Sequence, residues 1–104
     1  MIRVTVAYRN ESGKKFNWDY FSGPHNTLVH RELDSRGLVS LEQDKGISSA
    51  DPSASPPFVA MAHLTFNTIE EVHQAFQAVG GTVMGDIPNY TDIEPAIQIS
   101  EISS

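Results

Sequence analysis

Cysteine is absent from this chain of 104 residues. Its absence excludes disulfides, thiolate nucleophiles, iron–sulfur clusters and any haem or zinc site built on cysteine ligands. Basic residues are scarce, since seven lysines and arginines stand against thirteen aspartates and glutamates, which gives a net charge of −6 at pH 7. A negatively charged surface does not attract phosphate groups, so the composition argues against nucleic-acid partners and anionic membrane surfaces.

Long apolar runs and phosphate-binding loops are missing as well. No stretch approaches the roughly 18 apolar residues that cross a bilayer, and no cationic leader with an apolar region precedes the first strand-like residues. We therefore expect a cytoplasmic protein without a membrane partner. Gly80 and Gly81 follow a helical pattern and do not precede one, so they predict a helix end and not a nucleotide-binding loop. The Gly-x-Ser-x-Gly elbow of serine hydrolases is also absent.

Alternation of apolar and polar residues predicts the strands. The clearest runs cover residues 2–8, 38–46, 58–66 and 96–102, and a short strand is expected over 82–85. The segment 46–57 is rich in serine, alanine, glycine and proline, which is typical of an exposed loop.

Two helices are expected between these strands. Asn17 or Asp19 can cap an irregular turn over 18–22, and a regular helix then runs over about 24–34 until Gly37 stops it. Thr68 and Glu71 form a capping box that begins a second amphipathic helix. The order of elements predicts an α+β fold, a ferredoxin-like βαββαβ sandwich with two helices on one face of an antiparallel sheet. We expect one domain over residues 1–104, and a homodimer formed by the open face of the sheet.

Two short segments, 16–25 and 84–95, concentrate aromatic rings, carboxylates and a histidine. At 100° per residue His25 falls on the same apolar arc as Leu28, Val29 and Leu33, so it is expected to point toward the core or a pocket. Imidazole titrates near neutrality and can both accept and donate a proton. His25 is therefore either an acid/base group or a core histidine whose nitrogens are satisfied by a carbonyl or a hydroxyl.

The other candidate residues also have two interpretations. Trp18 and Tyr20 either line a pocket, with the Tyr20 hydroxyl on a ligand oxygen, or close the helix onto the sheet. Tyr90 is either a lid over the pocket or a plug between turn and helix. His63 either completes the pocket with His25 or lies in the dimer interface. Val29 is the remaining candidate for ligand contact.

A metal site is weighed and set aside. His25 and His63 with the carboxylates of Asp86, Asp92 or Glu94 would give a plausible ligand set, but no His-x-His or His-Glu-x-x-His spacing is present. The aspartates are explained equally well as turn residues that bond their own backbone. We expect no metal and no organic cofactor.

The chain resembles the EthD family of small dimeric α/β-barrel proteins. The matching residues are Trp18-Asp19-Tyr20-Phe21, then His25 and Leu28-Val29, then Ala62-His63-Leu64, and finally segments 86–95 and 97–100. Many relatives carry a Met-Pro pair after the histidine, where this chain has Asn26-Thr27 and places Pro24 before it instead.

The resemblance implies a small apolar pocket between the helices and the sheet. The family carries an oxidoreductase label through its gene clusters, fungal relatives act on aromatic polyketides as dehydratases or decarboxylases, and the wider group includes cofactor-free monooxygenases and isomerases. One expectation is thus oxidoreductase- or lyase-type acid/base chemistry on a small apolar or aromatic compound, using His25 and Tyr20. The alternative is a non-catalytic accessory protein of a catabolic pathway that holds such a compound unchanged.

Overall fold

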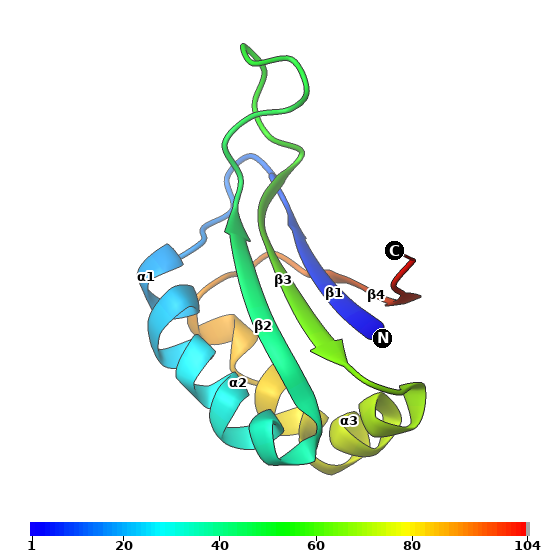
Figure 1. Ribbon diagram of the computed structural model, residues 1–104. Coiled ribbons are helices and arrows are strands. Elements are labelled where there is room, and N and C mark those ends of the chain that lie inside the picture. The colour runs from blue at the N-terminus through cyan, green and yellow to red at the C-terminus, as the bar shows by residue number, and fades with distance from the viewer. Residues whose placement is uncertain (104) are drawn as a thin grey trace.

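The computed structural model describes residues 1–103, in which four strands form one antiparallel sheet. These strands are β1 (Ile2–Arg9), β2 (Leu38–Lys45), β3 (Phe58–Phe66) and β4 (Ala96–Glu101), and their order across the sheet is β2-β3-β1-β4. The first strand of the chain therefore lies between β3 and β4 (Figure 1). The four long strands predicted from alternation are confirmed to within one residue at each end.

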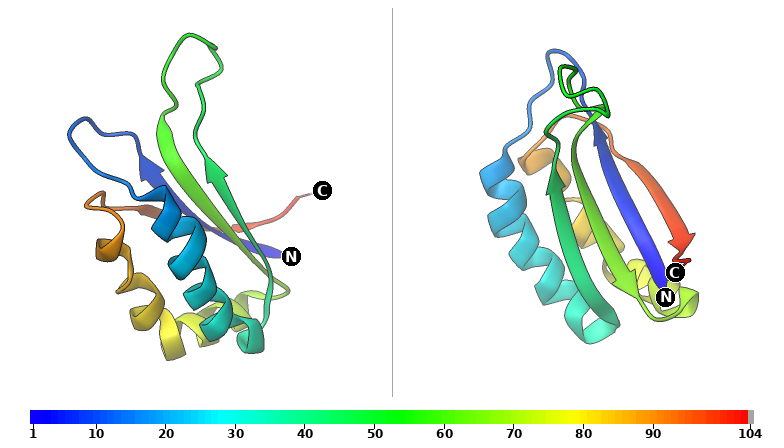
Figure 2. Two further views of the ribbon diagram at one scale, coloured as in Figure 1. Left: turned by 90° about the vertical axis from the view of Figure 1, so that its left-hand side faces the viewer. Right: turned by 45° about the horizontal axis from the view of Figure 1, so that its top comes forward.

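The helices cover one face of the sheet. The first helical segment runs through α1 (Trp18–Tyr20), η1 (Phe21–His25), α2 (Asn26–Leu33) and η2 (Asp34–Arg36), and the second helix is α3 (Ile69–Met84). A short 3-10 turn, η3 (Ile87–Asn89), connects α3 toward β4. Figure 2 shows both helices on the same side of the sheet and the opposite sheet face uncovered. The predicted ferredoxin-like βαββαβ architecture is confirmed.

The core lies between the helices and the sheet. Every second residue of β1 points toward the helices, and α2 and α3 contribute the apolar stripes that their periodicity predicts. The most completely buried large side chains are Tyr8, Tyr90, Phe21, Phe66, Leu33, Val4 and Val72. Two tyrosines therefore lie in the core with hydroxyl groups that need hydrogen-bond partners.

The first helical segment begins and ends where the sequence predicts, but its irregular turn lies at a different place. The Asn17 side chain accepts a hydrogen bond from the Tyr20 backbone N–H, and Gly37 ends the segment with a left-handed φ of 104°. The irregular turn is a π-type turn at 21–25, later than the predicted 18–22, and the regular α-helix begins at Asn26. Pro24 has no backbone N–H, so the α-helical hydrogen-bond ladder cannot run through this position.

The second helix is longer than predicted. The Thr68 hydroxyl accepts from the Glu71 backbone N–H, which confirms the cap. Gly80 and Gly81 do not end the helix, and the strand expected over 82–85 is wrong because α3 continues to Met84. Val83 is buried in the core on the face that the helical period assigns to it, and this burial outweighs the helix-breaking tendency of the two glycines.

The segment 46–57 projects beyond the end of the sheet as a long connection between β2 and β3 (Figure 1). None of the helices in residues 1–103 has the length and hydrophobicity needed to span a membrane.

Candidate functional site

The two segments that the sequence singles out lie side by side. Phe16 forms an isolated antiparallel bridge with Thr91, and the Asn17 backbone N–H donates to the Tyr90 carbonyl at 2.8 Å. The Thr91 hydroxyl donates to the Lys15 carbonyl. These contacts hold the beginning of the first helical segment against the turn that follows α3, and they bring His25 close to that turn.

One carboxylate at this junction accepts hydrogen bonds from three side chains. Asp86 Oδ1 accepts from the Tyr20 hydroxyl at 2.7 Å and from Asn89 Nδ2 at 2.8 Å, while Asp86 Oδ2 lies 2.9 Å from His25 Nδ1. Burial disfavours the charged form of Asp86, but the hydrogen bonds from Asn89, His25 and Tyr20 together outweigh it and lower the pKa of the carboxyl group. Asp86 is thus held as a carboxylate.

The state of Asp86 determines the tautomer of His25. A carboxylate only accepts hydrogen bonds, so His25 Nδ1 must carry the proton, and in the neutral ring Nε2 then has a free lone pair. The imidazole is nearly completely buried, with an exposed fraction of 5%. Its ring stacks on Phe21 at a centroid distance of 5.9 Å, and the Tyr90 ring lies 4.7 Å away on a tilted plane.

A pair of buried tyrosines continues the hydrogen-bond chain on the other side of the ring. The Tyr90 hydroxyl lies 3.4 Å from His25 Nε2, and the Tyr8 and Tyr90 hydroxyls are 2.5 Å apart. Burial raises the pKa of Tyr8 to about 12, although the hydrogen bond to Tyr90 opposes this shift. The pKa of Tyr90 is also raised, first by burial and then by the neighbouring Tyr8. Both phenols stay protonated, so one consistent direction of donation runs from Tyr8 through Tyr90 and His25 to Asp86.

A small cavity borders this chain. Its volume is about 20 Å³, and its lining includes Tyr8, His25, Val29, Gln43, Phe76 and Met84. The amide of Gln43 is fixed because its Nε2 donates to the Phe21 carbonyl and its Oε1 accepts from Asn26 Nδ2, both at 2.9 Å. A space of this size is just large enough for a single water molecule.

The predicted site residues are only partly brought together. Tyr20 and Tyr90 both contact the His25–Asp86 pair, and Val29 lines the cavity. Tyr90 is a buried plug and not a surface lid, since its exposed fraction is 1%. Trp18 does not line the cavity: its ring packs against Phe16 and Phe21, and the ammonium group of Lys45 lies 5.6 Å from its centroid. It closes the helix onto the sheet, which was the other interpretation of this residue.

His63 lies on the opposite face of the sheet from His25. Its neighbours Ala62 and Leu64 line the cavity, so alternation along β3 directs His63 away from it. His63 Nε2 is 2.8 Å from Asp44 Oδ2, and Nδ1 is 3.4 Å from the Thr5 hydroxyl. The prediction that His63 contacts the ligand beside His25 therefore fails on geometry, and the open sheet face remains its place.

Sequence reasoning missed three residues of the site. Asp86 was interpreted as a turn residue after being weighed as a metal ligand, and Gln43 and Tyr8 were not considered as polar groups of the pocket. Tyr8 continues the inward-facing series of β1, so a phenol at a core position was the available signal. Among residues 1–103, no three histidine, aspartate or glutamate side chains gather in a way that would hold a metal ion.

Comparison with known proteins gives matches among solved structures alone. No family model and no curated protein matches the chain. An EthD-like protein from Ralstonia eutropha JMP134 is 34% identical, with a TM-score of 0.88 over 96% of this chain and 89% of that one.

Two more distant structures share the fold. An EthD family protein from Bacillus halodurans C-125 is 16% identical, with a TM-score of 0.70 over 99% of each chain. A protein from Arabidopsis thaliana is 10% identical, with a TM-score of 0.68 over 99% of this chain and 95% of that one. The identity to the Ralstonia protein across nearly the whole chain decides the relationship: this chain belongs to the EthD-like family.

Proposed function

We propose that this protein binds a small apolar or aromatic compound between its helices and its sheet, and that His25 transfers a proton to or from an oxygen of that compound. The observation that carries the proposal is the buried imidazole whose Nδ1 is fixed on Asp86 while Nε2 faces the Tyr90 hydroxyl, in a side chain that also lines the cavity. A neutral imidazole held in one tautomer in this way is a suitable general base. This proton transfer serves lyase-type chemistry without an organic cofactor, and an oxidoreductase reaction at the same site would also need an electron acceptor such as dioxygen.

The surrounding residues have distinct roles in this proposal. Asp86 positions the ring and stabilises the imidazolium that forms when Nε2 accepts a proton, as a carboxylate does in other histidine-based sites. The Tyr90–Nε2 contact of 3.4 Å is long for a hydrogen bond, so a ligand hydroxyl can replace it at modest cost. Tyr20 contacts Asp86 and not the cavity, which makes it a positioning residue instead of the substrate-binding group expected from the sequence.

The test uses 4-nitrophenol, a small aromatic acid whose absorption band moves when its hydroxyl gives up a proton. The natural protein is expected to bind it and shift the band toward that of the phenolate. His25→Ala is expected to keep the fold and lose the shift, while His30→Ala serves as the control because that histidine lies in the following helix α2 with 43% of its side chain exposed. An undiminished shift in His25→Ala would show that His25 is not the proton acceptor.

A second function, ligand binding without conversion, is favoured by one observation. The cavity has room for a single water molecule, and both imidazole nitrogens already face hydrogen-bonding groups. In this case the protein is an accessory protein that stores or delivers an apolar compound. Recovery of the compound unchanged, with binding that persists in His25→Ala, is the result that would favour this function over proton transfer.

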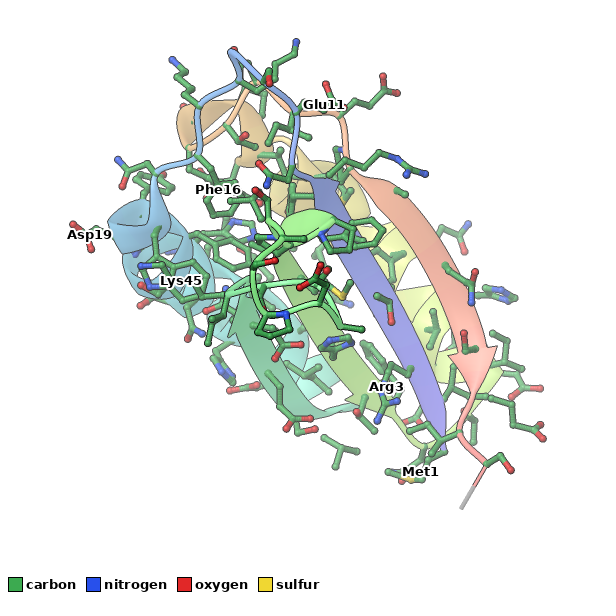
Figure 3. All side chains as sticks on the ribbon, turned by 90° about the horizontal axis from the view of Figure 1, so that it is seen from above. Met1, Arg3, Glu11, Phe16, Asp19 and Lys45 are labelled. Atoms are coloured by element: carbon green, nitrogen blue, oxygen red, sulfur yellow. The ribbon has the colours of Figure 1, made fainter. Side chains whose placement is uncertain are left out.

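We further propose that two copies pair through the open faces of their sheets. Within residues 1–103, Arg3 Nε is the single buried side-chain nitrogen or oxygen without a hydrogen-bond partner. Arg3 lies on this face, because its neighbour Val4 points toward the helices. Arg3 and Lys45 lie at opposite ends of the sheet (Figure 3). A buried guanidinium nitrogen without an acceptor supports a partner surface that supplies one.

A further inference from the structure

Met84 stands between the cavity beside His25 and a larger apolar hollow. The hollow has a volume of about 120 Å³ and lies between β4 and α3, where it is lined by Val4, Val72, His73, Phe76, Ile97 and Ile99. Three residues, Val6, Phe76 and Met84, line both the hollow and the cavity. The two spaces are therefore separated by a partition only one side chain thick.

The hollow has the size and lining of a site for a small apolar group. A buried cavity of about 150 Å³ lined by aliphatic and aromatic side chains binds benzene, and this hollow is only slightly smaller. Ile97 and Ile99 form its outer wall with exposed fractions of 51% and 45%, and both are isoleucines on the helix-facing side of the edge strand β4. Exposed apolar side chains that border a hollow are typical of a ligand site.

The cavity beside His25 is too small for any organic ligand, so a wall must move when one binds. Val6 belongs to the central strand β1, which is paired on both sides, and cannot move without disturbing the sheet. Phe76 packs closely over Gly80, where an added Cβ would lie 3.3 Å from its ring, and its ring centroid lies 6.5 Å from that of the buried Phe66. Met84 is the last residue of α3, is partly buried, and has an unbranched side chain with several rotatable bonds.

We propose that Met84 is the gate that joins the two spaces when a ligand binds, an inference that rests on the proposed function. The apolar or aromatic body of the ligand occupies the hollow against Phe76, Ile97 and Ile99, and its oxygen passes the displaced Met84 to reach Nε2 of His25. The size of residue 84 then determines how large a body fits while the oxygen still contacts the imidazole. Binding here is non-covalent, so the gate itself makes and breaks no bond.

The experiment compares phenol with 1-naphthol, which carries the same hydroxyl on a larger apolar body. Met84→Ala is expected to raise the affinity for 1-naphthol relative to phenol about tenfold, in line with the discrimination that one or two methylene groups give in apolar pockets. Met84→Phe is expected to lower this ratio. Val79→Ala is the matched control, since it removes apolar atoms from the same helix at a residue that lines neither space.

Xenon-pressurised crystals of the natural protein give a second measurement that needs no variant. Xenon is expected in the hollow beside Ile97, and in Met84→Ala it is expected to extend into the cavity beside His25. In the binding experiment, an unchanged ratio of naphthol to phenol affinity in Met84→Ala, or a change of equal size in Val79→Ala, would show that Met84 is not the gate. In the crystals, the absence of xenon from the hollow, or a second copy of the chain seated over Ile97 and Ile99, would show the same.

The failure of the gate and the failure of the proposed function can be told apart. If the ratio follows the size of residue 84 while 4-nitrophenol shows no His25-dependent shift, the gate stands and proton transfer is wrong. If the shift depends on His25 but the ratio does not depend on residue 84, proton transfer stands and the ligand reaches His25 by another route.

Discussion

Asp86 connects Tyr20, Asn89 and His25, and its charge is what makes the arrangement specific. Its two oxygens accept from a phenol, an amide and an imidazole N–H, so a single protonation would leave one of these donors without an acceptor. Because the carboxylate fixes the proton on His25 Nδ1, the chemical character of the imidazole is determined by a residue that does not itself line the cavity. In the proposed function Asp86 acts through His25 and is a positioning residue.

Replacing Asp86 by Asn tests this role through stability and its pH dependence. The folded-state pKa of Asp86 lies below its ordinary value of 3.8, so its ionised form stabilises the fold above that pH. The stabilisation is lost as the pH falls through the lower, folded-state pKa. We expect Asp86→Asn to lower the free energy of unfolding by about 1–3 kcal/mol near pH 7, and the difference from the natural protein to shrink below about pH 4. Urea unfolding between pH 3 and pH 7 measures both quantities.

The same variant has a readout that a purely structural role would leave unchanged. An Asn amide can donate to Nδ1, so the proton of the neutral His25 ring is expected to move to Nε2 in Asp86→Asn, which the ¹⁵N chemical shifts of the imidazole report. Asp92 is the matched control, because its lowered pKa results first from its bond to the Lys15 backbone N–H, away from His25. An unchanged tautomer in Asp86→Asn would refute the positioning role.

At the residue scale, the sequence predicts where side chains point better than it predicts their partners. Helical periodicity correctly places His25 on a buried face, because that inference needs only neighbours within two turns. Its partner Asp86 lies 61 residues away, and an aspartate in a turn has an equally good local explanation. For His63 the direction itself is undetermined by the sequence. Alternation along β3 shows that His63 and Met61 share a sheet face, but it does not show whether that face is covered by the helices.

At the scale of elements, α3 shows where local rules are outweighed by burial. Two adjacent glycines predict a helix end, yet the helix continues for another turn because Val83 and Met84 pack toward the core and the hollow. The N-cap at Thr68 and the strand β3 were predicted correctly, since each depends on a short pattern that tertiary contacts do not oppose. The π-type turn at Pro24 lies between these cases, because the proline predicts an irregularity but not its type.

The two glycines of α3 give a matched pair for testing this account. A Cβ at Gly81 meets nothing within 4 Å, so Gly81→Ala is expected to raise the free energy of unfolding by about 0.5–1 kcal/mol, since alanine loses less backbone entropy in a helix. A Cβ at Gly80 lies 3.3 Å from the Phe76 ring, so Gly80→Ala is expected to gain less or to destabilise the protein. Thermal and urea unfolding measure the difference, and equal effects of the two substitutions would contradict the helical packing of this turn.

At the scale of the molecule, the helices of residues 1–103 leave the opposite face of the sheet uncovered (Figure 2). It combines Arg3, with its unpaired Nε, and the His63–Asp44 pair at 2.8 Å. A surface that carries both signs of charge is self-complementary when a two-fold axis brings it against a second copy. The long 46–57 segment projects from one end of this sheet, and none of its residues lines the cavity beside His25 (Figure 1).

Met61 is the residue on which we test the proposed dimer. It lies on β3 two residues before His63 and so points to the same open face, where it is partly buried in a single chain. Glutamate at this position would place a charge at the centre of the paired sheets, and burial of an unpaired carboxylate is strongly unfavourable. We expect the natural protein to have the mass of a dimer in light scattering. Met61→Glu is expected to raise the dissociation constant of the dimer at least about tenfold.

Gln77→Glu is the control, because it adds the same charge on the exposed face of α3. A monomeric natural protein, or a Met61→Glu variant that dimerises as the natural protein does, would show that the open sheet face is not the interface.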